Sequence, residues 1–350
     1  MTSTTDAGAD GPAQTSGGIA APDPKRWLAL AAILSAGLMD LLDVTIVNVA
    51  IPSIESQMKA GYSAIQWITA GYALAFAAVL ITGGRLGDLY GRKRLFLIGM
   101  SGFTIASARG GFAATPGMLI GARVFQGGMA ALMVPQVMAI IHVTFPANER
   151  GKVMGMFGGI VGSAAVAGPI LGGLLVQWNL FGLHWRPIFL VNLPVGVFGL
   201  IVAFRVISES RAPHATKLDL PGVVTFSGGL FFLIFALVRG NPEGWTSGLI
   251  VGFLAIGALL LVAFVVIETR TQDPMFDLQL LRKPAFTGAG IAAFSLSSSM
   301  FAMFLYITLY VQNSLGFKPL DAGLRFLPIT ILSFFAAPLS GRLSGKGVPI

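Results

Sequence analysis

The chain has 350 residues, of which 55% are hydrophobic and 11% are charged. An average soluble domain has about 25% charged residues, so this composition excludes a water-soluble globule and predicts a polytopic membrane protein. The net charge of +8 comes from short basic clusters between apolar runs, which indicates topology signals rather than a nucleic-acid-binding domain. The sequence has no Cys, which excludes disulfides and Cys-ligated metals.

Apolar windows fill the chain from Trp27 onward, whereas residues 1–26 predict a disordered cytoplasmic tail because they are mostly small and polar. A helix needs about 20 residues to cross the bilayer core, and ten windows of that kind alternate with Gly, Pro or charged joints. They are 27–51, 64–83, 95–113, 117–141, 153–177, 187–205, 218–238, 246–267, 286–312 and 324–341. The predicted fold class is therefore an all-α membrane protein.

The distribution of Lys and Arg predicts the orientation of these spans. With the N-terminus in the cytoplasm, sixteen of the 23 basic residues fall on the inner side. The outer loops then hold four, and three lie within spans. Because basic residues favour cytoplasmic loops, we expect a multi-pass plasma-membrane protein with a cytoplasmic N-terminus.

The first span contains Asp40 and Asp43, the two acids that lie deep inside the predicted spans. They are three residues apart and share one helical face. A charged acid costs about 2.5–3.5 kcal/mol at mid-membrane, so both are expected to face the protein interior or a wet cavity. Each acid is either a proton carrier or a fixed structural acid. Residues 42–52 read LDVTIVNVAIP, which resembles the first-helix signature of fourteen-span drug:proton antiporters of the major facilitator superfamily.

A tight basic turn joins the second and third spans, where residues 84–94 read GRLGDLYGRKR. The pattern resembles the cytoplasmic signature loop of the same superfamily, although Leu89 stands where the family often has Arg. Gly residues permit close approach and positive φ, and the acid near the helix end has basic residues in reach. The resemblance assigns a gating role to Gly84, Gly87, Asp88, Gly91, Arg92 and Lys93. The alternative is a plain positive-inside turn.

The fourth span carries RVFQGG at residues 123–128, which resembles the family motif of this helix and includes Arg123, Gln126 and Gly127. At 1.5 Å per residue, Asp43 lies about 10 Å and Arg123 about 9 Å from the outer ends of their spans. The two side chains can therefore meet. Arg keeps its proton at accessible pH, so Arg123 is expected to tune an acid or hold a polar network. The alternative is an Arg that snorkels outward.

The fifth span contains GPILGG at residues 168–173. Small residues allow close helix packing, and a helical Pro leaves a carbonyl unpaired. The motif resembles the one that marks antiporters in the superfamily, carried by Gly168, Pro169, Gly172 and Gly173, and it argues for export over import. General small-residue helix packing is the alternative. Residues 185–196 read WRPIFLVNLPVG, which again resembles the fourteen-span branch.

A weak repeat of Gly84-Arg85-Leu86 at residues 341–343 predicts the domain organisation. This repeat follows the tenth span, whereas in a twelve-span relative it would follow the eighth, so two helices are inserted between the halves. We expect a six-helix bundle at 27–205, two linker helices within 206–285, and two helices of an incomplete second bundle at 286–350. The chain is then about two thirds of a fourteen-span protein.

The resemblance implies a secondary transporter that exports amphipathic drugs or other small molecules in exchange for protons, and so confers antibiotic resistance. Its expected partners are those substrates, protons and the lipid bilayer, with no nucleic acid, cofactor or metal, and the protein is expected to act as a monomer. No Walker A sequence occurs, which excludes direct use of ATP. An enzyme is not expected. A proton-coupled uptake transporter and a non-functional fragment remain as alternatives.

Overall fold

The structure, a computed structural model, describes residues 24–212, 218–271, 274, 276–317 and seven further residues between 321 and 336. These residues form helices and connecting turns, with no strand among them. The elements are α1 (Arg26–Met58), α2 (Tyr62–Tyr90), α3 (Arg92–Gly111), α4 (Pro116–Thr144), α5 (Ala147–Trp178), η1 (Leu180–Gly182), α6 (Pro187–Leu190), α7 (Asn192–Val206), α8 (Leu220–Glu243), α9 (Gly248–Glu268), η2 (Leu278–Arg282), α10 (Pro284–Leu309) and η3 (Tyr310–Ser314).

Each of the first nine predicted windows coincides with helical structure, the sixth being divided into α6 and α7. Seven helical segments of the described residues are long and apolar enough to cross a membrane: α1, α2, α4, α5, the α6–α7 pair, α8 and α9. Of the tenth window, 324–341, the structure describes only six residues, and the predicted tail up to residue 23 lies outside the described residues. The prediction of an all-α membrane protein is confirmed.

Local sequence signals set where several helices begin. Thr115 precedes α4, and its side chain accepts a hydrogen bond from the amide of Met118 at 3.2 Å, which satisfies one free amide of the first turn. Asp219 does the same for α8 through the amide of Gly222, at 3.0 Å. The turn between α2 and α3 is a single residue, Gly91, whose φ of 116° suits glycine.

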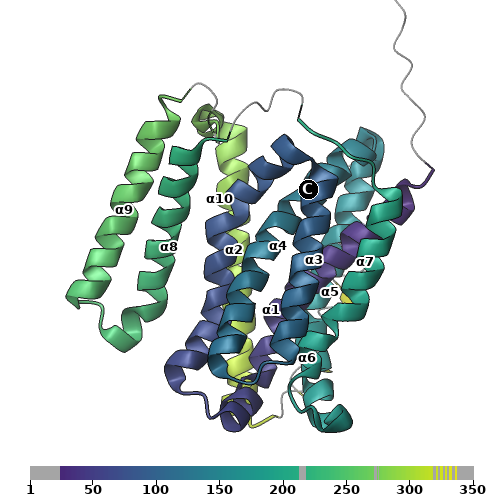
Figure 1. Ribbon diagram of the computed structural model, residues 1–350, viewed down its shortest axis with the longest axis vertical. Coiled ribbons are helices and arrows are strands. Elements are labelled where there is room, and N and C mark those ends of the chain that lie inside the picture. The colour runs from purple at the N-terminus through teal and green to yellow at the C-terminus, as the bar shows by residue number, and fades with distance from the viewer. Residues whose placement is uncertain are drawn as a thin grey trace, which may run out of the picture.

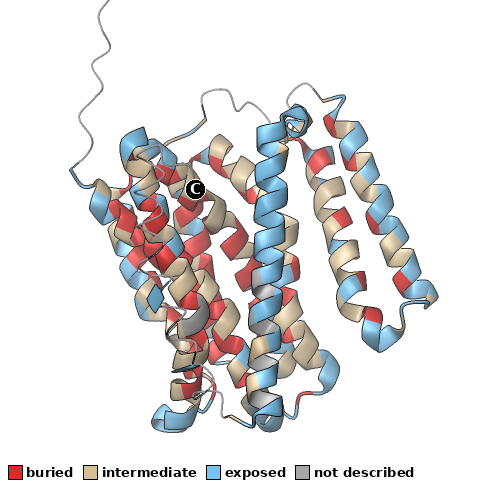
Figure 2. Ribbon diagram, turned by 180° about the vertical axis from the view of Figure 1, so that it is seen from behind, coloured by how far each residue is buried: buried red, intermediate tan, exposed pale blue. Residues whose placement is uncertain are grey.

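Helices α1 to α7 form one bundle (Figure 1). Within it α1 packs against α5 and α7, and α4 packs against α2 and α3. Helices α8 and α9 form a separate hairpin that contacts the bundle through α2. Figure 2 shows nearly all described side chains of α10 exposed, and many residues of the hairpin exposed as well.

The interior of the bundle has two apolar clusters, one toward each end. The first contains residues such as Leu30, Phe96 and Ile140, and the second contains residues such as Ile46 and Phe189. Along α1 and α4 the first cluster gives way to the second near the middle of the helix. The buried polar side chains described next lie in this middle layer.

Candidate functional site

The middle of the bundle holds a buried ion pair between Asp43 of α1 and Arg123 of α4, whose side chains are 0% and 2% exposed. Two amides also donate to Asp43 Oδ1: Gln126 Nε2 at 2.8 Å and Asn192 Nδ2 at 2.9 Å. Ser107 Oγ lies within hydrogen-bond distance of both amides, at 2.8 and 3.0 Å. The matching depths of Asp43 and Arg123 therefore correctly predicted that they meet.

Arg123 is held on several sides by the protein. Its Nε donates to the carbonyl of Ile68 at 3.1 Å, and one terminal nitrogen donates to Gln126 Oε1 at 2.7 Å. The guanidinium also lies 4.3 Å from the ring centroid of Tyr72 and 5.9 Å from that of Phe189, which are cation–π distances. Arg123 does not snorkel outward, because its charge is compensated within the bundle.

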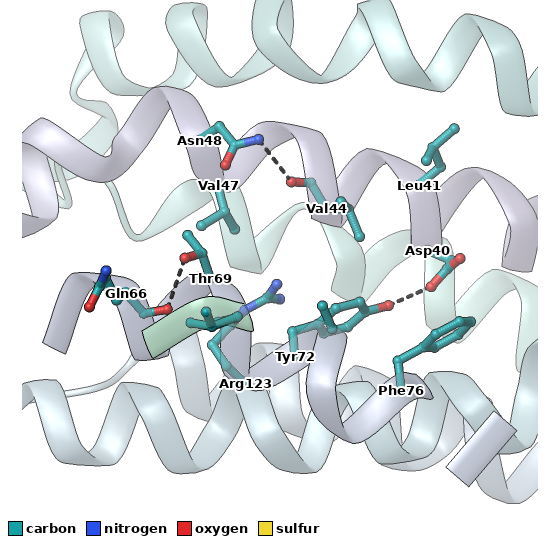
Figure 3. A pocket seen from close by; sticks show the side chains of 13 residues that line it. Asp40, Leu41, Val44, Val47, Asn48, Gln66, Thr69, Tyr72, Phe76 and Arg123 are labelled. Atoms are coloured by element: carbon teal, nitrogen blue, oxygen red, sulfur yellow. Dashed lines mark hydrogen bonds between the residues drawn. The ribbon is translucent and has the colours of Figure 1, made fainter. Parts of the chain in front are cut away.

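A cavity of about 660 Å³ lies beside this network. Its lining is largely apolar and comes from α1, α2, α4 and α8. Six lining residues carry charged or hydrogen-bonding groups: Asn48, Gln66 and Thr69, and the three nearest the ion pair, Asp40, Tyr72 and Arg123. Figure 3 shows these three side chains approaching one another from different helices, and the Tyr72 hydroxyl donates to Asp40 Oδ1. The cavity has the size and lining of a small-molecule binding site.

The two acids of α1 have different surroundings, although they are only three residues apart. Asp40 lines the cavity and is partly exposed, whereas Asp43 is fully buried among side chains of α3, α4 and α7. Both acids therefore face the protein interior or a cavity, as expected, but their neighbours differ. Three residues turn a helix by about 300°, and this offset is enough to point one side chain at the cavity and the other behind its wall.

The signature-loop residues lie at the α2–α3 junction. Asp88 and Arg92 form an ion pair of 2.8 Å, as their spacing predicts. Gly84 and Gly87 lie inside α2, so the expected positive φ is found in this loop only at Gly91. The backbone amide of Lys93 donates to Glu209 at 3.0 Å.

The loop also contacts the last turn of α7 and the segment after it. The Lys93 ammonium donates to the Phe204 carbonyl at 2.8 Å, and the amide of Arg94 donates to Glu209 at 3.2 Å. Further along, the amide of Ala212 donates to the Asp88 carbonyl at 3.1 Å. These contacts attach the α2–α3 junction to the chain that follows the bundle.

The glycines of the α5 motif form the contact between α5 and α1. Gly168, Gly172 and Gly173 are buried. A Cβ on Gly168 would overlap the Thr45 side chain, and one on Gly172 would lie 2.9 Å from the Ile46 side chain. Pro169 lies inside α5 without ending the helix. In α4, a Cβ on Gly127 would likewise overlap the Tyr72 carbonyl.

Among the residues of the site that the sequence reasoning did not assign are Tyr72, Ser107, Asn192 and Val238. Asn192 stood within a quoted motif, and a buried amide in a span was a usable signal. Tyr72 also combines a polar group with a position inside a span. Serine is common in membrane helices, and Val238 is one of many apolar residues in its span, so the sequence does not distinguish Ser107 or Val238 from their neighbours. Among the described residues, no group of three or more His, Asp or Glu could hold a metal ion.

A multi-pass bundle with an internal cavity and a buried ion pair is the architecture of a membrane transporter, and the sequence profile of the Major Facilitator Superfamily matches residues 33–350. The chain belongs to this superfamily. It is 43% identical over 343 residues to the probable actinorhodin transporter of Streptomyces coelicolor, an alignment that covers 96% of the chain and 59% of that relative.

Two further relatives are named for resistance or export. The tetracenomycin C resistance and export protein of Streptomyces glaucescens is 34% identical over 93% of the chain and 60% of its own length. The puromycin resistance protein of Streptomyces alboniger is 37% identical over 88% of the chain and 60% of its own length. The chain thus spans about three fifths of the length of these relatives.

Proposed function

We propose that this chain belongs to a proton-driven exporter of amphipathic small molecules. The observation that carries the proposal is the apolar cavity with Asp40 and Arg123 on its wall, next to the buried Asp43. An apolar lining accepts lipophilic compounds of many shapes, and a carboxylate favours those that carry a positive charge. The names of the relatives support export as the direction of transport.

Asp40 is the proton-exchanging acid in this proposal. It lines the cavity, so a bound cation and a proton compete for the same carboxylate, whereas Asp43 is enclosed by Arg123, Gln126 and Asn192. A proton on Asp43 Oδ2 would have to displace Arg123, which is bonded to that oxygen. The resemblance favours Asp43 as the proton carrier, whereas the position of Asp40 on the cavity wall supports Asp40 in that role.

Tyr72 connects the two charged sites. Its hydroxyl binds Asp40 and its ring stacks under the Arg123 guanidinium. Protonation of Asp40 changes the hydrogen-bond acceptor of the Tyr72 hydroxyl. Because the hydroxyl is attached to the Tyr72 ring, this change also acts on the ring that contacts Arg123. We infer that the protonation state of Asp40 affects, through Tyr72, the Asp43–Arg123 pair, which joins α1 to α4.

The orientation proposed from the basic residues places the α2–α3 junction in the cytoplasm. The fourteen-span layout is also part of the proposal, with α8 and α9 inserted between the α1–α7 bundle and α10. Two features support it: the α8–α9 hairpin packs outside the bundle, and residues 341–343 repeat the start of the signature loop. In alternating access the bundles rock around the cavity.

Transport into everted membrane vesicles tests this function. The interior of vesicles that contain the chain is made acidic, and rhodamine 123, a fluorescent amphipathic cation, is added outside. We expect dye accumulation that follows the pH gradient, and its loss in Asp40→Asn, because an amide still accepts the Tyr72 hydrogen bond but carries no exchangeable proton. Glu55→Gln, at an exposed site near the end of α1, is the matched control and should transport normally. Gradient-driven accumulation that survives Asp40→Asn would contradict the assignment.

A further inference from the structure

Helix α8 lies outside the α1–α7 bundle but runs along α2 in the opposite direction. An Arg239 guanidinium nitrogen donates to Ser63 Oγ at 3.0 Å, and the rings of Trp67 and Phe235 are 5.3 Å apart. Farther along, the Ser227 hydroxyl donates to the Ala78 carbonyl. At 1.5 Å per residue these contacts span about 20 Å of each helix, so α8 follows α2 rather than crossing it at one point.

The second helix of the hairpin supports α8 from its other side. Phe253 of α9 lies 4.9 Å from Phe235 and 5.4 Å from Phe232 of α8, measured between ring centroids. Nearer the other end, Phe226 and Phe264 are 4.9 Å apart. Aromatic pairs at these distances add stability beyond their burial, so α8 is held between α2 and α9.

Val238 places α8 in the wall of the cavity. Among the described residues, the other twelve that line the cavity belong to α1, α2 and α4. Val238 directly precedes Arg239 and lies within one turn of Phe235, so the two contacts with α2 fix its position. A side chain held in this way cannot move aside freely when a ligand enters.

We infer that α8 forms one wall of the ligand cavity and that Val238 limits the size of the ligand accepted there. The inference rests on the proposed function, because it takes the cavity as the substrate site. A mostly apolar wall discriminates by shape, since it offers few hydrogen bonds, and a misfit of one methylene in such a pocket changes affinity about 10–200-fold. The hairpin is then part of the binding site as well as a connection.

Two dyes of equal charge and different size test the inference by fluorescence binding to the chain in lipid nanodiscs. Rhodamine 6G carries extra ethyl and methyl groups on the rhodamine 123 skeleton. In Val238→Phe we expect rhodamine 6G to bind about tenfold more weakly or worse, with less than about threefold change for rhodamine 123. Val224→Phe makes the same change elsewhere on α8, at a residue that is 64% exposed, and it should leave both affinities unchanged.

A smaller side chain gives a second reading that does not depend on tolerance of the larger one. Val238→Ala should raise the affinity for rhodamine 6G relative to rhodamine 123, since it enlarges the same end of the cavity. If wild type binds both dyes and neither Val238 variant changes their ratio, α8 is not a wall of the site, whereas the proposed function stands. If wild type binds neither dye, the proposed function is wrong, and so is the inference that α8 forms a wall of the ligand cavity.

Discussion

Arg123 and Asp43 are fully buried charges, and burying a charge is costly unless it is paired and hydrogen-bonded. Arg123 meets that condition through Asp43, Gln126 and the Ile68 carbonyl. Asp43 meets it through Arg123 and two amides. Such a pair adds little net stability by its presence, but removal of one partner leaves an uncompensated charge. The pair therefore fixes how α1 and α4 sit against each other.

A double-mutant cycle measures this dependence. Arg123→Met and Asp43→Leu should each lower the free energy of unfolding by about 3–5 kcal/mol, because each leaves one buried charge alone. The double variant should lose less than the sum, with a coupling of about 1–3 kcal/mol. Denaturant unfolding in detergent micelles provides the values. Arg109→Met, at an exposed site of α3, serves as control and should change stability by less than about 0.5 kcal/mol. Additive losses would show that the pair does not act as one unit.

The ion pair was predictable from the sequence, whereas its surroundings were only partly so. Depth along a span follows from residue number, so Asp43 and Arg123 could be matched. The direction of a side chain around the helix axis depends on how neighbouring helices pack. That direction separates Asp40 from Asp43 and brings Tyr72 and Ser107 to the site, and no single helix determines it.

At the scale of elements, the contact between α1 and α5 depends on the absence of side chains at the α5 glycines. Gly168 faces Thr45 and the backbone of Ile46, where an added Cβ would lie 3.1 Å from the Ile46 amide nitrogen. Gly162 lies in the same helix, and a Cβ added there would have no neighbouring atom within 4 Å. Substitutions at the two positions therefore distinguish the effect of helix packing from the effect of helix propensity.

Gly168→Ala should separate α5 from α1 and lower the free energy of unfolding by about 1–3 kcal/mol, the usual cost of overpacking. Gly162→Ala should be neutral or stabilise by up to about 1 kcal/mol, because Ala favours the helix where space is open. Thermal unfolding of the two purified variants compares them directly. Equal melting temperatures for both would contradict a close packing role for the motif.

The ends of the helices were less predictable than their existence. Helix α2 continues to Tyr90, seven residues past the apolar window 64–83. A helix need not stop where its apolar window ends, since charged side chains such as Arg85 and Asp88 are tolerated once they reach the interface. The division of the sixth span into α6 and α7 had no strong signal in the sequence.

At the scale of the whole molecule, the fully buried ion pair of Asp43 and Arg123 lies in the middle of the bundle, and the other ion pairs of its described residues lie near helix ends. The position of the α8–α9 hairpin could not be predicted, because composition shows that these helices span the membrane but not which neighbour they contact. Its contacts with α2 place it beside the cavity. The bundle and the hairpin together therefore line the proposed site.

In the proposed mechanism, ligand binding and proton binding compete at Asp40. The most direct test adds rhodamine 123 to the chain in nanodiscs in weakly buffered solution and follows a pH indicator, because competing ligands must displace each other reciprocally. We expect proton release when the dye binds to wild type or to Glu55→Gln, and none when it binds to Asp40→Asn. Proton release that persists in Asp40→Asn, or dye binding by wild type without any release, would contradict this mechanism.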